Sequence, residues 1–133
     1  MENKVTVLCT TYNQERFLKQ TLDGFVMQKT NFPFEVIIGD DCSTDNAQQI
    51  LKEYAKKYPK TIKPILREQN IGPDNNFNDI ANMVKSEYVA ICEGDDYWTD
   101  PLKLQKQADF LDSNPDFAIC FHPVRMFYED NSQ

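Results

Sequence analysis

Residues 34–45 read FEVIIGDDCSTD, a short apolar run that ends in acidic and hydroxyl side chains. The run at 34–39 has the length and the apolar, partly β-branched composition of a buried strand. The next stretch, 45–58, carries apolar side chains at helical spacing, and Asp45 with Gln48 resembles a capping box at its start. A buried strand that passes through a polar turn into an amphipathic helix is the repeating unit of α/β folds.

The same alternation extends on both sides of this stretch. Further strands are expected from apolar runs at 4–9, 61–66, 87–92 and 117–121. Further helices are expected from periodic patterns at 14–28, 75–84 and 99–112, with Asn13 and Thr99-Asp100-Pro101 at two of their starts. Pro64 indicates a sheet edge, because proline has no N–H for a ladder. Strands separated by helices predict a mostly parallel sheet.

The size and charge of the chain limit the kinds of protein that it can be. With 133 residues it is one ordinary domain, which we expect at 1–128 with a short tail at 129–133. The net charge of −7 argues against a nucleic-acid surface, and no apolar run is long enough to cross a membrane. The four cysteines form no CxxC pair, so we expect reduced core thiols and a cytoplasmic protein.

Acidic residues gather at the expected ends of the strands, where parallel sheets bind their ligands. They are Asp40, Asp41, Glu93, Asp95 and Asp96. Two like charges about 4 Å apart repel by roughly 4 kcal/mol at an effective dielectric near 20, so such a cluster favours a bound cation. Oxygen ligands without a neighbouring His or Cys suit Mg²⁺ or Mn²⁺. In the alternative interpretation, these acids only cap helices and form turns.

Aromatic residues stand beside these acids. Tyr12 follows the first expected strand and could stack on a planar base, or it could pack on Phe17. A carboxylate such as Asp41 could accept the N3–H of uracil. Tyr97 and Trp98 follow the last acids and either cover the site or pack the loop.

Four motifs in this order resemble those of the family 2 glycosyltransferases. They are 5–13 (VTVLCTTYN), 36–45 (VIIGDDCSTD), 70–72 (NIG) and 93–96 (EGDD), the last being similar to the metal-binding DxD motif. The resemblance covers nearly the whole chain. It implies the A-type glycosyltransferase fold, a Rossmann-like three-layer α/β sandwich, with this chain as its donor-binding half.

The resemblance also implies roles for individual residues. Thr10 and Tyr12 would line the base pocket, and Asp41 would bond the edge of the base. Asp95 would lie near the ribose or sugar, and Asp96 would hold Mn²⁺ or Mg²⁺ on the diphosphate. Arg67 stands close to where the family has a basic residue near the nucleotide. Glu93 departs from the motif by its longer side chain, so Asp96 and Asp95 are the stronger metal ligands.

The implied reaction is the inverting transfer of a sugar from a nucleoside-diphosphate sugar, with UDP as the expected nucleotide, to a hydroxyl of a glycan or lipid-linked acceptor. The family's general base lies well downstream of the DxD motif, and neither Glu129 nor Asp130 is assigned to it. We therefore expect either a truncated chain or a shortened protein with only the donor half, which binds the donor and transfers poorly or not at all. Polysaccharide or glycan assembly at the inner face of the plasma membrane is the expected setting; peripheral membrane association and self-association stay open.

Two other functions compete with this one. A sugar nucleotidyltransferase would also use an α/β sheet and a metal, but it should have a glycine-rich loop after the first strand, where this chain has Thr10-Thr11-Tyr12-Asn13. A non-catalytic nucleotide-binding or interaction module that retains the fold is the other alternative. A longer protein with a further acid downstream would favour the enzyme.

Overall fold

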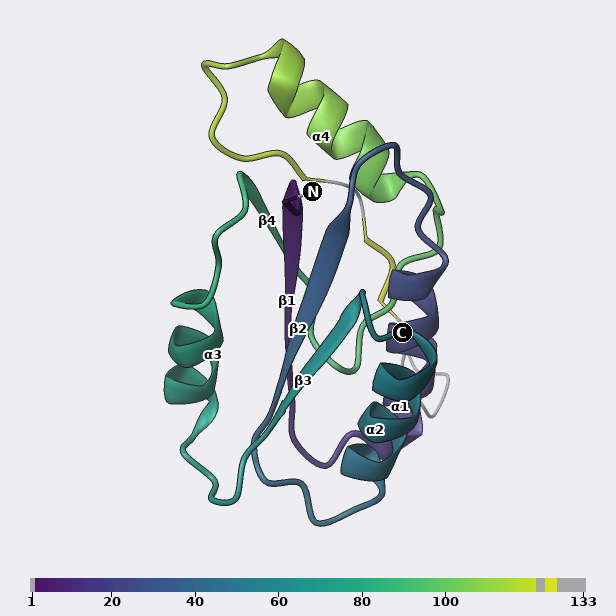
Figure 1. Ribbon diagram of the computed structural model, residues 1–133, viewed down its shortest axis with the longest axis vertical. Helices are drawn as coiled ribbons and strands as arrows, with labels where there is room; N and C mark the ends of the chain where they lie inside the picture. Colours follow the sequence, from purple (N-terminus) through teal and green to yellow (C-terminus); the bar gives the residue numbers. More distant parts are fainter. Residues whose placement is uncertain (1, 122–123, 127–133) are drawn as a thin grey trace.

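A computed structural model describes residues 2–121 and 124–126 (Figure 1). In this part of the chain, strands and helices alternate without exception. The strands are β1 (Val5–Thr11), β2 (Phe34–Asp40), β3 (Ile62–Leu66) and β4 (Tyr88–Ile91). The helices are α1 (Glu15–Val26), α2 (Ala47–Lys57), α3 (Pro73–Ala81) and α4 (Lys103–Ser113).

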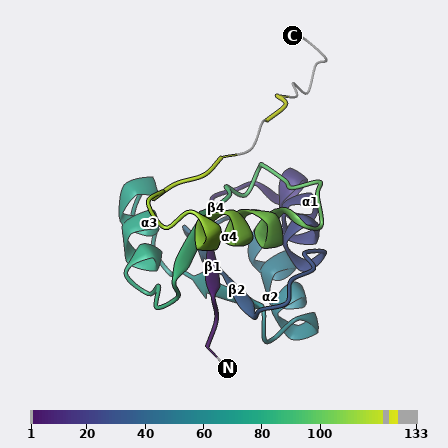
Figure 2. The same ribbon diagram turned by 90° about the horizontal axis from the view of Figure 1, so that it is seen from above.

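The described strands form one parallel sheet in the order β3-β2-β1-β4. The register pairs Val5 with Phe34 and Thr11 with Asp40, so β1 and β2 end side by side. Helices cover both faces, with α3 on one and α1 and α2 on the other (Figures 1 and 2). The predicted α/β three-layer fold is therefore confirmed, and Pro64 lies on an edge strand as expected.

Alternate side chains of each strand enter two separate cores. Val7 and Cys9 of β1 pack in the larger core, which α1 and α2 cover. Leu8 packs in the smaller core, beneath Ile80 of α3. Because both faces are buried, the strands read as nearly continuous apolar runs in the sequence. Thr10, two residues after Leu8, consequently lies on the α3 side of the sheet.

The four cysteines are unpaired, and two of them lie in the core. Cys9 and Cys92 are buried, and burial raises the pKa of the Cys92 thiol to about 12. A thiol that remains protonated is a poor nucleophile and metal ligand. The expected inert core thiols are thus confirmed for Cys9 and Cys92, whereas Cys42 and Cys120 are only half-buried.

The strand expected at 117–121 is wrong. Phe117, Ile119 and Phe121 are exposed, and among the described residues no strand pairs with them. Their apolar composition suggested a strand, but a strand also needs a neighbouring strand for its backbone hydrogen bonds. The expected tail at 129–133 lies outside the described residues.

The expected helix starts are also corrected. Asn13 has a left-handed backbone, with φ of 51°, and Gln14 takes the capping position of α1 without a side-chain bond. The Asp45–Gln48 capping box does not form, since Gln48 Nε2 donates to Asp40 instead. α4 begins at Lys103 rather than Thr99, after a turn in which Asp100 accepts the N–H of Leu102.

None of the helices in the described part of the chain is both long and apolar enough to cross a bilayer.

Candidate donor and metal site

The carboxyl ends of the strands form one edge of the molecule, at the bottom of Figure 1. α4 lies at the opposite edge, where Asp112 bonds Lys4 at 2.9 Å and the Tyr88 hydroxyl at 2.6 Å. Since α4 lies elsewhere, the carboxyl edge is formed by the loops that follow β1, β2, β3 and β4. Ligands of parallel sheets bind at this edge.

Glu93, Asp95 and Asp96 form an exposed acidic cluster in the loop after β4. One carboxylate oxygen from each lies within 4.8 Å of the others, a group that could share one metal ion. The donors are all oxygen, which is the set that Mg²⁺ and Mn²⁺ prefer. The residues present therefore fit the divalent metal that the sequence predicted.

The glycine inside this cluster lets the loop lie close to β1. Gly94 donates its backbone N–H to the carbonyl of Thr10 at 3.0 Å. A Cβ at Gly94 would lie 2.7 Å from the side chain of Thr11, so only glycine fits without a shift. This contact fixes Glu93 and Asp95, on either side of Gly94, at the end of the first strand.

Thr21 of α1 supports the acidic loop through its side chain. This residue was not predicted from the sequence. Its buried hydroxyl lies 3.0 Å from the carbonyl of Gly94 and within hydrogen-bonding reach of the carbonyl of Asp96. Thr21 occupies the apolar face of α1, between Leu18 and Leu22. A hydroxyl on a core-facing stripe was the sequence signal that could have indicated this role.

Asp96 is exposed, but partial desolvation of its carboxyl raises its pKa, and the neighbouring Asp95 charge raises it further. Both causes make the ionised carboxylate less favourable. A divalent cation would reverse this effect, because it stabilises the ionised form that coordinates it. The direction of the pKa shift is thus consistent with an acid placed for a cation.

Asp40 and Asp41 do not join this cluster, although all five acids were expected to face one crevice. Asp40 is buried and accepts from the Ser43 hydroxyl at 2.5 Å and from Gln48 Nε2 at 2.8 Å. Its side chain therefore follows the core-facing side of β2, toward α2. Asp40 organises the β2–α2 loop, so the group that could share an ion consists of three acids, not five.

Asp41 binds the loop before α3. Its carboxylate is buried and accepts the backbone N–H of Ile71 at 2.8 Å and of Gly72 at 3.0 Å. Asn70 Nδ2 donates to the Asp41 carbonyl at 3.0 Å. Each carboxylate oxygen has a second lone pair, so Asp41 could still accept from a ligand.

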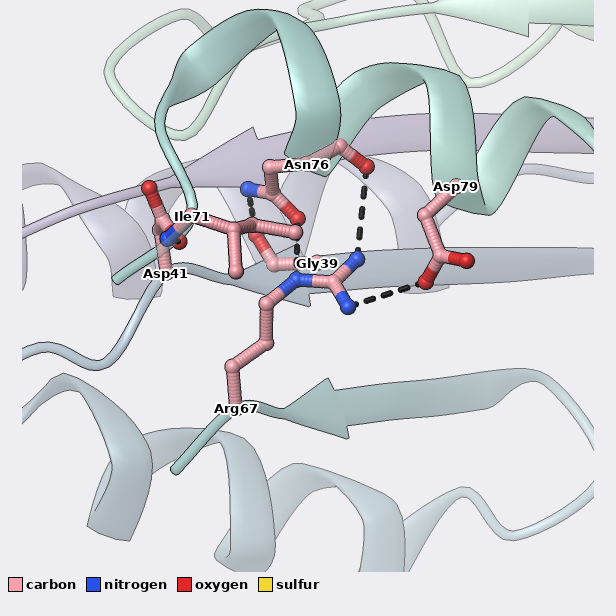
Figure 3. A network of polar contacts seen from close by, with 6 residues as sticks. All are labelled: Gly39, Asp41, Arg67, Ile71, Asn76 and Asp79. Atoms are coloured by element: carbon pink, nitrogen blue, oxygen red, sulfur yellow. Dashed lines mark hydrogen bonds and ion pairs between the residues drawn. The ribbon is translucent and has the colours of Figure 1, made fainter. Parts of the chain in front are cut away.

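Arg67 faces α3 (Figure 3). Its Nε donates to Asn76 Oδ1 at 2.9 Å, and its guanidinium also pairs with Asp79 at 2.9 Å. Asn76 is buried and donates in turn to the carbonyl of Gly39 at 2.9 Å. These bonds fix α3 against β2, and the nucleotide contact expected of Arg67 stays a prediction.

The loops after β1 and β2 are held together by Asn13. Its backbone N–H donates to the Ser43 hydroxyl at 2.9 Å, and its side chain accepts the N–H of Thr44 at 2.8 Å. Tyr12 precedes it with half its surface exposed. Trp98 is buried instead, with its ring edge-on to Phe25 at 5.0 Å, so of the two open alternatives it packs the loop.

A cavity of about 390 Å³ opens between α3 and the ends of β1 and β4. Thr10 and Glu93 line it from the sheet, and Asp74, Phe77 and Asn78 line it from α3. Glu93 belongs to both the cavity and the acidic cluster. Thr10, Tyr12 and the acidic loop thus lie at one edge of the sheet, as the sequence predicted.

Residues 6–132 match the model of glycosyl transferase family 2. The chain belongs to this family. An uncharacterized protein of Mycobacterium tuberculosis is 52% identical to this family 2 chain over 97% of its length, and the alignment spans 37% of that relative. The family 2 chain therefore spans little more than a third of the curated relative's length.

Two solved structures share the fold of this family 2 chain. TarS 1-349 of S. aureus, in complex with UDP-GlcNAc, superposes with a TM-score of 0.74 at 31% identity. The superposition covers 95% of this chain and 38% of TarS 1-349. The mannosyltransferase PcManGT of Pyrobaculum calidifontis, in complex with GDP-Man and Mn²⁺, gives a TM-score of 0.72 at 23% identity, over 84% of this chain and 33% of its own.

Proposed function

We propose that this chain is the donor-binding part of a metal-dependent glycosyltransferase that uses a nucleoside-diphosphate sugar, with UDP as the first nucleotide to test. The observation that carries the proposal is the acidic cluster, in which oxygens of Glu93, Asp95 and Asp96 lie within 4.8 Å of one another. TarS in complex with UDP-GlcNAc and PcManGT in complex with GDP-Man and Mn²⁺ support it through the shared fold.

Different residues of the site bind different parts of the donor. Asp96 and Asp95, with Glu93 as a third ligand, would hold Mn²⁺ or Mg²⁺. When bound, that ion offsets the negative charge that builds on the leaving nucleoside diphosphate. Thr10 and Tyr12 line the base pocket. Asp41 contacts the edge of the base while it holds the Ile71–Gly72 backbone.

Arg67 has a positioning role beside the nucleotide contact that the sequence suggested. Its guanidinium is bonded to Asn76 and Asp79. We assign it to positioning α3, which forms one wall of the cavity beside the acidic cluster. These bonds and a third to the Asn76 carbonyl use three of the five guanidinium N–H groups, so a nucleotide contact by Arg67 would come from the two that remain.

The whole protein would transfer the sugar to a glycan or lipid-linked acceptor hydroxyl with inversion, in polysaccharide or glycan assembly. A general base takes the proton from the acceptor in such a displacement. No described residue is assigned to that step. Donor binding is the step that we assign to the described residues.

Calorimetry tests the proposal with UDP and GDP, each titrated with Mn²⁺, with Mg²⁺ and with EDTA. Heat that requires protein, nucleotide and metal together, after subtraction of the heat of metal–nucleotide complexation without protein, supports the donor site. Asp109→Asn removes one negative charge from α4, at the opposite edge of the sheet. It is the control variant and should bind normally. Absence of metal-dependent heat with both nucleotides would refute donor binding.

A further inference from the structure

The cavity beside the acidic cluster has a wall that the assigned roles leave unused. Asp74 and Asn78 of α3 line it, and they lie four residues apart, so they share one face of the helix. Phe77 also lines it and packs on the smaller core through Leu8, Ile37 and Ile80. The wall thus combines two polar side chains with one aromatic ring.

The polar side chains of this wall are available to a ligand. Neither Asp74 nor Asn78 makes a side-chain hydrogen bond to any residue within 2–121 or 124–126, and Glu93 across the cavity makes none either. Asp40, Asp41 and Arg67 differ in this respect, because their polar atoms already bond neighbouring loops and α3. Two kinds of acid therefore lie at this edge of the sheet. Asp40 and Asp41 bond the protein itself, whereas the carboxylate oxygens of Asp74 and Glu93 have no protein partner among the described residues.

The chemistry of the wall favours a neutral polyol over a phosphate. Asp74 and Glu93 are its charged groups, and no lysine or arginine lines the cavity. Carboxylates repel a phosphate unless a cation lies between them. A sugar hydroxyl can instead donate to Asp74 and both donate to and accept from the amide of Asn78, while the C–H face of the ring packs on Phe77.

We propose that Asp74 and Asn78 bind the hydroxyl groups of a sugar ring in the donor. This rests on the proposed function, since Glu93 joins the cavity to the acidic cluster. A diphosphate held at that cluster has a sugar ring on each side, the ribose of the nucleotide and the sugar that is transferred. Both present the same hydroxyl chemistry, and binding measurements distinguish them.

The wall is fixed before the ligand arrives. Asn76, buried on the same helix, donates to the Gly39 carbonyl and accepts from Arg67. Asp41 holds the backbone of Gly72, directly before α3. A ligand that meets a prearranged wall loses less affinity to the ordering of side chains and loops.

The test compares Asp74→Ala and Asn78→Ala with Asp109→Ala, a control on α4, in the 133-residue chain with Mn²⁺. Calorimetry measures UDP, 2′,3′-dideoxy-UDP and UDP-GlcNAc, and in parallel GDP, its dideoxy form and GDP-mannose. If the wall binds the ribose, both α3 variants weaken UDP or GDP by on the order of tenfold and leave the dideoxy form unchanged. If it binds the transferred sugar, they weaken only the nucleotide sugar.

The contrary outcomes are distinct. Asp74 in the first turn could merely stabilise the helix dipole, in which case its variant would lower the melting temperature and weaken every ligand equally. Equal weakening of all ligands, or affinities that match Asp109→Ala, would overturn this inference while donor binding stands. A wild-type chain that binds no nucleotide with Mn²⁺ would overturn the proposed function and this inference together.

Discussion

The carboxylate of Asp41 accepts the backbone N–H of Gly72 at 3.0 Å and so joins the end of β2 to the start of α3. The same carboxylate accepts the N–H of Ile71 at 2.8 Å, so two backbone donors depend on one buried side chain. The acid that the sequence pointed to as a base contact therefore also builds the loop before α3.

Asp41→Ala should destabilise the fold by about 1.5–3 kcal/mol, because the backbone N–H groups of Ile71 and Gly72 lose a charged acceptor. Asp41→Asn should cost less, since its single carbonyl oxygen can still accept one of them. Urea unfolding of both variants measures this difference, with Asp109→Ala as the surface control. An Asp41→Ala variant as stable as the control would contradict the structural role.

Gly39 and Asn76 should be coupled. A Cβ at Gly39 would lie 2.2 Å from Asn76 Oδ1, so Gly39→Ala should cost about 1–3 kcal/mol through overpacking. Asn76→Ala alone should cost a similar amount, because it leaves the Gly39 carbonyl and the Arg67 Nε without their partner.

The double variant should cost less than the sum of the two single variants by about 1 kcal/mol or more, because the second change removes the clash caused by the first. Urea unfolding of all four proteins completes the cycle. Additive costs would show that the two residues do not act on one another.

Gly94→Ala should weaken Mn²⁺ binding by on the order of tenfold, as expected when a residue that supports metal ligands is altered. The new Cβ would meet Thr11 at 2.7 Å, and the loop must move because Thr11 is part of a central strand. Mn²⁺ titration in the presence of UDP measures the effect, with circular dichroism to confirm that the fold is intact. Unchanged affinity would mean that the loop tolerates the shift.

Asp96→Asn should make the metal-free chain more stable at pH 7. Partial desolvation and Asp95 raise the pKa of Asp96 above its ordinary value of 3.8, so the folded state holds this proton to a higher pH than the unfolded state. Stability therefore falls as the pH rises through this interval, and the ionised wild type bears the cost at pH 7.

Melting temperatures in EDTA at pH 7 and pH 4 test this prediction. The advantage of the Asn variant should shrink at pH 4, where Asp96 of the wild type is protonated to a greater extent. Addition of Mn²⁺ and UDP should stabilise the wild type alone. A metal-free wild type that is more stable than the variant at pH 7 would show that the charge is not unfavourable.

The parallel sheet could be predicted from the sequence because its buried strands appear there as short apolar runs. Runs such as 34–39 face helices on both sides and keep few polar residues. Residues 117–121 have the same composition and no strand, since pairing depends on a partner that composition does not report. Helix starts were less predictable, because Gln48 and Asn13 bond to other loops rather than to their own helix.

The acids at the strand ends were predictable as a group but not individually. A sequence shows that Asp40, Asp41 and Asp96 follow strands, yet the alternation at the end of β2 turns Asp40 toward α2. The bonds of Arg67 to Asn76 and Asp79 were unpredictable for a related reason, since these partners lie in a helix whose placement depends on tertiary packing. Thr21 and Asn78 matter through neighbours that are distant along the chain.

The most direct test of the account is the amount of Mn²⁺ that the chain binds in the presence of UDP or GDP, measured from the electron paramagnetic resonance signal of free Mn²⁺. The wild type should bind Mn²⁺ beyond the amount that the nucleotide alone chelates, and Asp96→Ala should not, while its circular dichroism stays that of the folded chain. Equal binding by the two proteins would contradict a metal site at Glu93, Asp95 and Asp96.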